Sequence, residues 1–195
     1  RFLAIEANLI TIEPVERVVR ETVEGLGGLD ILVNNAARQQ TRPAIADISS
    51  EDFDATLKTN VYAPFWLTKA AVTRTQAGGV IVNTSSEQAG DPSEDLVDYA
   101  LTRAAVLNFT KSMAKQLAPK GIRVNAVTPG PFWTPLQVSG GATPEKLQQF
   151  GSQAPLGRPG QPAEIAGLYV AAADPLLSYS TGQVFGATGG GGQPG

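Results

Sequence analysis

Residues 80–103, VIVNTSSEQAGDPSEDLVDYALTR, decide the fold of this 195-residue chain. They begin with three β-branched residues behind a Gly-Gly pair, a pattern typical of a short strand buried on both faces. The strand runs into a hydroxyl cluster, and after a polar loop a helical apolar pattern begins near residue 96. Tyr99 and Arg103 stand four residues apart near the start of that helix, so they share one of its faces.

Three side chains of this stretch could together carry chemistry. Ser86 follows the strand, while Tyr99 and Arg103 lie on the next helix. A nearby cation favours the ionised form of a phenol, and a serine hydroxyl can hold a substrate oxygen within reach of it. A Tyr–Arg pair by itself is more often a plain contact on a helix surface, so this interpretation depends on the rest of the chain.

The composition is that of an ordinary globular protein, with 42% hydrophobic and 17% charged residues. A net charge of −3 offers no basic field that would attract nucleic acid or a membrane surface. No apolar run approaches the roughly 18 residues that a transmembrane helix needs. We expect a cytoplasmic protein with a small-molecule partner, and neither nucleic acid nor membrane.

The chain contains no cysteine and no histidine. Disulfides, thiol nucleophiles, thiolate zinc sites and mechanisms with a histidine base are therefore excluded. The sequence also shows no ligand loop for an oxygen-only metal site, so we expect no metal. An enzyme built from these residues must take its proton donor from Tyr, Asp, Glu or Lys.

Short apolar runs alternate with helical patterns along the chain. Strands are expected at residues 2–7, 31–33, 80–82, 122–127 and 183–187, with the second and third of them buried. Helices are expected at residues 12–26, 50–72, 98–118 and 162–173. This alternation predicts an α/β fold, a Rossmann-like doubly wound parallel sheet with helices on both faces.

Local signals add detail to this plan. Ser49 and Asp52 have the spacing of a capping box at the start of the second helix, and Pro64 is expected to kink it. Residues 131–160 are rich in Pro, Gly, Gln and Ser, which suggests a substrate lid with one short helix after Pro144. We expect one domain over residues 1–188 and a disordered tail over residues 189–195.

Ser86, standing thirteen residues before Tyr99 and followed by a basic residue at Arg103, resembles the active site of the short-chain dehydrogenase/reductase family. That family has a serine and then Tyr-x-x-x-Lys. The resemblance implies that Tyr99 is the general acid/base, that Ser86 anchors the substrate oxygen, and that Arg103 is the electrostatic partner. Likeness to bacterial glucose or sugar-alcohol-type dehydrogenases is strongest over residues 96–136.

Further motifs follow in the order of the family and extend the resemblance over nearly the whole chain. Asn34-Asn35-Ala36-Ala37 resembles its Asn-Asn-Ala-Gly stretch, which contacts the cofactor ribose, and Asn60 matches an asparagine that helps hold a water in the proton relay. Pro129-Gly130 with Thr134 resembles the segment that contacts the nicotinamide carboxamide, and Asn8 stands near the adenine position. Each of these motifs also has a purely structural explanation: a turn for Asn34, a kink or a packing accident for Asn60, and an ordinary loop for Pro129-Gly130.

The resemblance implies an oxidoreductase that interconverts a secondary alcohol and a carbonyl with NAD or NADP. The implied cofactor-binding residues are Asn8, Asn34, Ala36, Tyr99, Arg103, Pro129, Gly130 and Thr134. The family commonly forms dimers or tetramers through its two long helices, here residues 50–72 and 98–118. The substrate, the reaction direction and the choice between NAD and NADP cannot be read from these residues.

One departure from the family pattern is the absence of a Gly-rich phosphate loop after a strand before Asn34. In the family this loop belongs to the first strand, and without the first two strands the run at residues 2–7 has no neighbour for its backbone hydrogen bonds. We therefore expect an N-terminal βαβα segment to precede residue 1.

A second departure is Arg103 in place of lysine. A guanidinium is larger than an ammonium, planar and almost never deprotonated, which makes it a poor proton relay. We expect weakened catalysis, or a catalytically dead dinucleotide-binding or scaffold protein as the alternative. A third interpretation is a fragment that assembles only in an oligomer.

Overall fold

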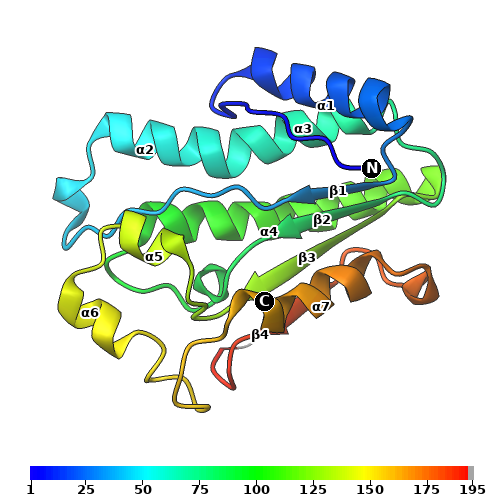
Figure 1. Cartoon of the computed structure of the whole chain (residues 1–195). Coiled ribbons are helices and arrows are strands. Elements are labelled where there is room, and N and C mark those ends of the chain that lie inside the picture. Colours follow the sequence, from blue (N-terminus) through cyan, green and yellow to red (C-terminus); the bar gives the residue numbers. More distant parts are fainter. Residues whose placement is uncertain (193–195) are drawn as a thin grey trace.

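The computed structural model describes residues 1–192, with a parallel sheet in the order β1-β2-β3-β4 at its centre (Figure 1). The strands are β1 (Ile31–Asn34), β2 (Val80–Thr84), β3 (Arg123–Pro129) and β4 (Val184–Ala187). Helices cover both faces of this sheet, as parallel strands require for their crossovers. The predicted α/β, doubly wound architecture is confirmed.

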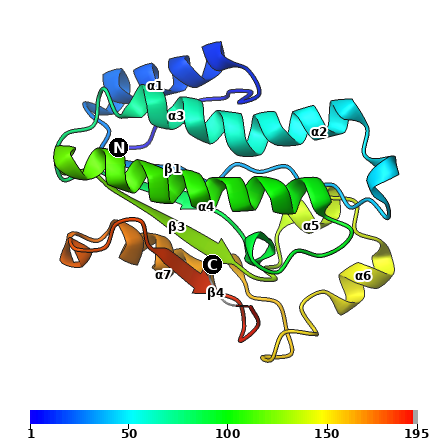
Figure 2. The same cartoon turned by 180° about the vertical axis from the view of Figure 1, so that it is seen from behind.

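The helices are divided unequally between the two faces (Figures 1 and 2). On one face, α4 (Val97–Leu117) packs on β2 and β3, and α3 (Ala63–Ala71) packs on β1. On the other face, α7 (Pro162–Ala173) covers β2, β3 and β4. The N-terminal helix α1 (Ile12–Leu26) packs on α3.

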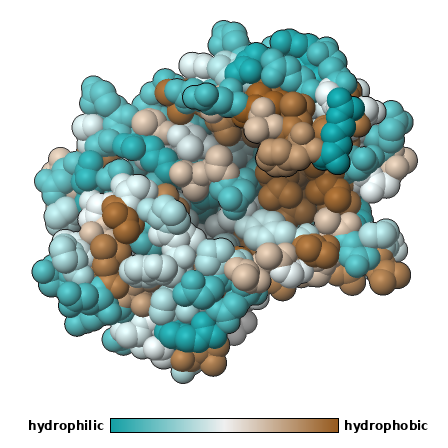
Figure 3. All heavy atoms as spheres, viewed as in Figure 1, coloured by the Kyte–Doolittle hydropathy of each residue, from teal (hydrophilic) through white to brown (hydrophobic). Residues whose placement is uncertain are grey.

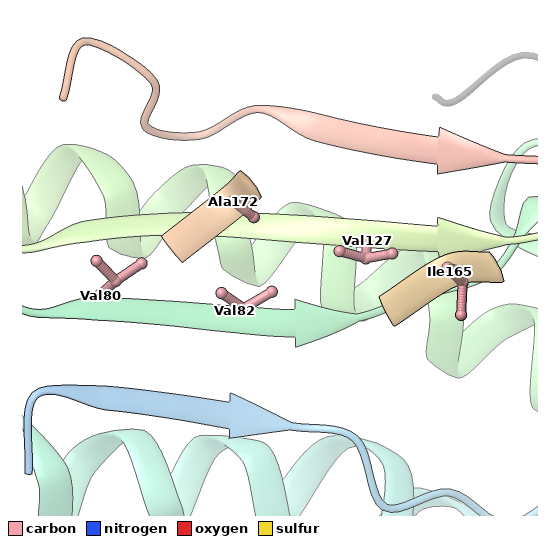
Figure 4. Close-up of a cluster of buried hydrophobic side chains, with 5 residues drawn as sticks. All are labelled: Val80, Val82, Val127, Ile165 and Ala172. Carbon is pink, nitrogen blue, oxygen red and sulfur yellow. The ribbon is translucent and has the colours of Figure 1, made fainter. Parts of the chain in front are cut away.

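Alternating residues of β2 face the two helical layers. Val80 and Val82 meet Val127 of β3 and, from α7, Ile165 and Ala172 (Figure 4). On the α4 side the cluster consists of Ile81, Ala114, Leu117, Ile122 and Val124. Residues 80–82 are 0–3% exposed, so the prediction of a strand buried on both faces is confirmed for β2.

The same prediction is wrong for β1. Ile31 is 49% exposed and Val33 44% exposed, although Ile31 pairs with Val80 and Val33 with Val82. Only Leu32 points into the apolar clusters beneath α3 and α4. The reason is that α7 packs mainly on β2, β3 and β4 and covers β1 little, and Figure 3 shows apolar surface over the N-terminal segment and β1.

The expected strand at residues 2–7 is also not formed. Within residues 1–192 no strand lies beside this segment, so its backbone groups have no ladder to join. Phe2 is 90% exposed, and the segment is held to α1 by the side chain of Arg17, which donates to the carbonyl of Glu6 at 2.7 Å.

The long helix predicted for residues 50–72 is interrupted. α2 (Ser50–Leu57) is followed by a π-helical turn (Lys58–Tyr62) and then by α3. Pro64 cannot donate the hydrogen bond that a regular helix sends to the carbonyl of Asn60, and the wider turn lies at that point. Ser49 caps α2 by accepting from the Asp52 N–H at 3.0 Å. The Asp52 carboxylate does not complete the expected capping box, because it pairs with Arg38 and Arg42 instead.

Two short helices occupy the region that the sequence suggested as a lid. They are α5 (Pro135–Ser139), which was not predicted, and α6 (Pro144–Gln149), which begins at Pro144 as expected. Gly140 accepts from the N–H of Thr41 at 2.8 Å, which ties α5 to the segment after β1. Of the predicted tail, residues 189–192 are described and Gly189 accepts from Leu156 N–H at 3.0 Å, while 193–195 lie outside the described residues.

Across residues 1–192, no helix combines the length and the apolar character needed to cross a membrane.

Candidate active site

A pocket of about 750 Å³ opens at the carboxyl ends of β1, β2 and β3. This is the edge at which ligands bind in open α/β sheets. Its walls come from the end of β1 and the residues after it (33, 35–37 and 39), the end of β2 and the residues after it (84–88), the first turns of α4, the end of β3 and the residues after it (129–132 and 134–137), and α7. Residues that are far apart in the sequence thus meet in one cavity.

Ser86 enters the pocket from the end of β2. It is 8% exposed, and its Oγ accepts from the N–H of Gln88 at 3.2 Å as the cap of a short helical turn, Glu87–Ala89. The neighbouring Ser85 also lines the pocket, but its hydroxyl is engaged, because it donates to the carbonyl of Arg103 at 2.8 Å. This bond fixes the end of β2 against the second turn of α4.

Tyr99 and Arg103 line the same pocket from α4. The guanidinium carbon of Arg103 lies 4.7 Å from the centre of the Tyr99 ring, in cation–π range. Asp98 holds the start of this helix, since its Oδ1 accepts from the N–H of Tyr99 and its Oδ2 from the hydroxyl of Thr56. The expected convergence of Ser86, Tyr99 and Arg103 on one pocket is what the geometry shows.

Arg103 is 2% exposed and carries spare donors. Its Nη1 donates to the carbonyl of Thr84 at 2.8 Å, whereas Nε and Nη2 are buried with no partner within residues 1–192. A buried, unpaired N–H costs free energy until an acceptor reaches it. The hydroxyls of a nicotinamide ribose are such acceptors, so the residues present fit the cofactor that the family implies.

The loop after β3 supplies the opposite wall. Pro129, Gly130 and Thr134 all line the pocket, and so does Ala36 after β1. The backbone at Gly130 is tightly enclosed, because a Cβ there would stand 2.7 Å from the Cα of Thr188. Four of the residues implied for cofactor binding are thereby gathered around Tyr99 and Arg103.

Two of the residues implied for cofactor binding lie elsewhere. Asn8 is outside the pocket, and its Oδ1 accepts from the N–H of Ile10 in a turn. Asn34 is buried, and its amide donates to Asn83 at 2.8 Å, while its Oδ1 has no partner in the described chain. These placements leave the cofactor roles of Asn8 and Asn34 as predictions.

Asn60 is fully buried in the π-helical turn and does not line the pocket. Its amide donates to the carbonyl of Arg38 at 2.8 Å and to the hydroxyl of Thr102 at 3.0 Å, and its Oδ1 accepts from the N–H of Arg38. Asn60 therefore links the segment after β1, which carries Ala36, to α4 next to Tyr99.

Sequence reasoning missed two ionisable pocket residues. Tyr169 of α7 lies 2.8 Å from the hydroxyl of Thr84 and 3.4 Å from Oδ1 of Asn35, and burial raises the pKa of its phenol. Glu87, directly after Ser86, also lines the pocket. The signal for Tyr169 was its position four residues after Ile165 on the face of α7 that meets the sheet; the signal for Glu87 was only its adjacency to Ser86.

Comparison with known proteins agrees with this geometry. A family model described as enoyl-(acyl carrier protein) reductase matches residues 2–191. An uncharacterised oxidoreductase of Escherichia coli, YghA, is 51% identical over 89% of this chain and 59% of its own length. A glucose and ribitol dehydrogenase homolog of Oryza sativa is 44% identical over 96% of this chain and 65% of its own length. The chain thus spans about three-fifths of the length of these curated relatives.

Solved structures show the same relationship. A dehydrogenase/reductase from Sinorhizobium meliloti has a TM-score of 0.89 at 34% identity, covering 96% of this chain and 73% of that one. A short-chain dehydrogenase from Burkholderia cenocepacia, in complex with NADP, has a TM-score of 0.87 at 31% identity, covering 96% and 75%. The resemblance seen in the sequence is confirmed, and the chain belongs to the short-chain dehydrogenase/reductase family.

Proposed function

We propose that this protein is an NAD- or NADP-dependent oxidoreductase that interconverts a secondary alcohol and a carbonyl. The observation that carries the proposal is the meeting of Ser86, Tyr99 and a doubly unpaired Arg103 in one pocket at the carboxyl edge of the sheet. Tyr99 donates its phenol proton to the substrate oxygen in reduction and takes it back in oxidation. The hydroxyl of Ser86 holds that oxygen in place.

Arg103 would hold the nicotinamide ribose with its two free donors and stabilise negative charge on Tyr99. Gly130 and Thr134 would orient the nicotinamide from the opposite wall, beside Ala36. When bound, the cofactor supplies or accepts the hydride. Complexes with NADP and with NADH among the structural neighbours support this assignment without separating the two cofactors.

Asn60 would act as a positioning residue for the proton path. Its side chain joins the backbone of Arg38 to Thr102, three residues beyond Tyr99. Its role in holding a relay water, which the family resemblance implies, is part of this proposal. Asn8 and Asn34 are proposed to meet the cofactor only at its periphery.

A second candidate function is dinucleotide binding without turnover. The observation in its favour is Arg103 itself, whose guanidinium is fixed over the Tyr99 ring and on the carbonyl of Thr84. Because a guanidinium stays protonated, it cannot pass a proton onward as a lysine could.

The two candidates are separated by the absorbance of the reduced nicotinamide, measured with a panel of secondary alcohols and ketones. The wild type is expected to turn over slowly, and Arg103→Lys is expected to raise kcat by roughly tenfold. Arg74→Lys, the same change at an exposed position in the turn after α3, is the control. If Arg103→Lys turns substrate over and the wild type does not, the binding-only candidate is supported for the wild type. If the wild type and Arg103→Lys both bind the cofactor and neither turns substrate over, the oxidoreductase proposal is contradicted.

We also propose that the protein forms a homo-oligomer through its two long helical segments. These helices expose large apolar side chains at Phe53, Tyr62, Phe65, Val97 and Leu101. Burying such side chains in a subunit contact is favourable. Light scattering tests this directly, since a monomeric mass at micromolar concentration would contradict it.

A further inference from the structure

We propose that Glu87 determines substrate specificity, by accepting a hydrogen bond from an O–H or N–H group next to the reacting carbon and by disfavouring substrates with an anionic group there. This inference rests on the proposed function, because it places the reacting oxygen at Ser86. It assigns a role to an acid that neither the proton transfer nor cofactor binding uses.

The position of Glu87 is the first argument. It follows Ser86 directly and lines the same pocket. Its Oε2 lies 2.8 Å from the point that a Cβ on Gly130 would occupy, so the carboxylate rests against the glycine of the loop proposed to orient the nicotinamide. A substituent on the carbon next to the reacting carbon would therefore meet this carboxylate.

The lack of a partner is the second argument. Within residues 1–192 the Glu87 side chain is half-buried, and no hydrogen bond or ion pair is formed by its carboxylate. Among the described residues of the pocket lining, Arg103 is the only one with a cationic side chain, and its Nη1 is engaged by Thr84. Glu87 is thus an acceptor without a donor inside a cavity that is otherwise largely apolar.

Electrostatics agree with this position. Burial, together with the nearby carboxylate of Asp91, raises the pKa of Glu87 above its ordinary value. Both effects oppose a negative charge at this point. A substrate O–H or N–H would donate to this half-buried carboxylate, whereas a substrate carboxylate would place a second negative charge beside it.

The alternative is a purely structural role, in which Glu87 only stabilises the short helical turn after Ser86, because acidic side chains are favourable near a helix N-terminus. Such a role would affect folding or overall rate. It would not change the ratio between two substrates that differ only in the group beside the carbonyl, and this ratio is the readout that separates the two explanations.

The test uses three methyl ketones, namely 2-butanone, hydroxyacetone and pyruvate, whose groups beside the carbonyl are ethyl, hydroxymethyl and carboxylate. Their kcat/KM values are compared in the intact protein with reduced cofactor, for wild type, Glu87→Gln and Glu94→Gln. Glu94 is an exposed acid of the same loop outside the pocket, so its variant removes an equal charge.

The wild type is expected to prefer hydroxyacetone over butanone, and butanone over pyruvate, each on the order of tenfold. In Glu87→Gln the pyruvate-to-butanone ratio should rise on the order of tenfold and the hydroxyacetone preference should shrink, while Glu94→Gln keeps both wild-type ratios. Unchanged ratios in Glu87→Gln overturn the inference.

Saturation-transfer NMR on the cofactor-saturated protein compares the binding constants of the three ketones. The ratios between these binding constants do not depend on turnover. If the wild type reduces no ketone, the binding-only candidate is supported, and the binding ratios still decide the role of Glu87. If none of the three ketones binds, the specificity role is overturned as well.

Discussion

Val82 and Val33 are cross-strand neighbours in register on the same face of the sheet, yet Val82 is 0% exposed and Val33 is 44% exposed. Their sequence contexts are nearly alike, because each is the third residue of a short β-branched or aliphatic strand. The difference comes from α7, which packs mainly on β2, β3 and β4 on this face and covers β1 little. Burial of a strand is thus decided by the helix above it.

This difference divides the pocket into two halves. The half built by β2, Ser86 and α4 stands on a fully buried core, so the reacting groups are held rigidly. The half next to Val33 borders apolar surface that α7 covers only in part. The proposed catalytic residues lie on the buried half, and the open half borders Ala36, which is proposed to meet the cofactor.

The largest effect on stability is expected when the two valines are truncated in separate variants and compared. Val82→Ala should lower the free energy of unfolding by about 2 kcal/mol, because it leaves a cavity under α7. Val33→Ala should change it by less than about 0.5 kcal/mol, since its side chain is already half in water. Urea denaturation of both variants measures this. Equal losses would contradict the assignment of burial to α7.

A smaller effect is expected at the start of α7, which creates the difference between the two strands. Glu164 pairs with Arg158 and accepts from the N–H of Gln161 at 2.8 Å, and these contacts lower its pKa to about 2. Because the folded pKa is below the ordinary value of 4.5, this stabilisation is present above pH 4.5 and is lost as the pH falls from there toward 2.

Glu164→Gln should therefore lower Tm on the order of 1 °C at pH 7 and reduce the loss of Tm between pH 4.5 and 3. Glu51→Gln, which changes an exposed glutamate on α2, is the matched control for the loss of one negative charge. An identical acid dependence in wild type and Glu164→Gln would show that the cap at α7 does not contribute.

Most of the fold was predictable because the sequence in and around the central strands has local patterns that identify them. The β-branched run at residues 80–82, the helix around Tyr99 and the strand ending at Pro129 each have local patterns that tertiary structure reinforces. The exposure of Val33 was not predictable from local pattern, since it depends on which elements lie beside it. The unpaired state of residues 2–7 followed from the missing phosphate-loop strand rather than from their own apolar pattern.

The site was predictable where a motif fixes the spacing, as for Ser86, Tyr99 and Arg103. Tyr169 was missed because it reaches the pocket from a helix 70 residues after Tyr99 in the sequence, and nothing local marks it. The sequence showed Asn60 only as an asparagine in the middle of a helix. The hydrogen bonds that it makes to Arg38 and Thr102 depend on tertiary packing, so they could not be predicted.

The proton-donor role of Tyr99 is tested most directly by Tyr99→Phe, which removes one hydroxyl and keeps the ring under Arg103. We predict that kcat/KM falls roughly 10²–10⁴-fold while binding of the reduced cofactor, followed by its fluorescence, is retained. Tyr179→Phe, at a fully exposed position, should behave as wild type. Retention of more than about a third of the activity in Tyr99→Phe, or its loss in Tyr169→Phe instead, would contradict the assignment of Tyr99 as the general acid/base.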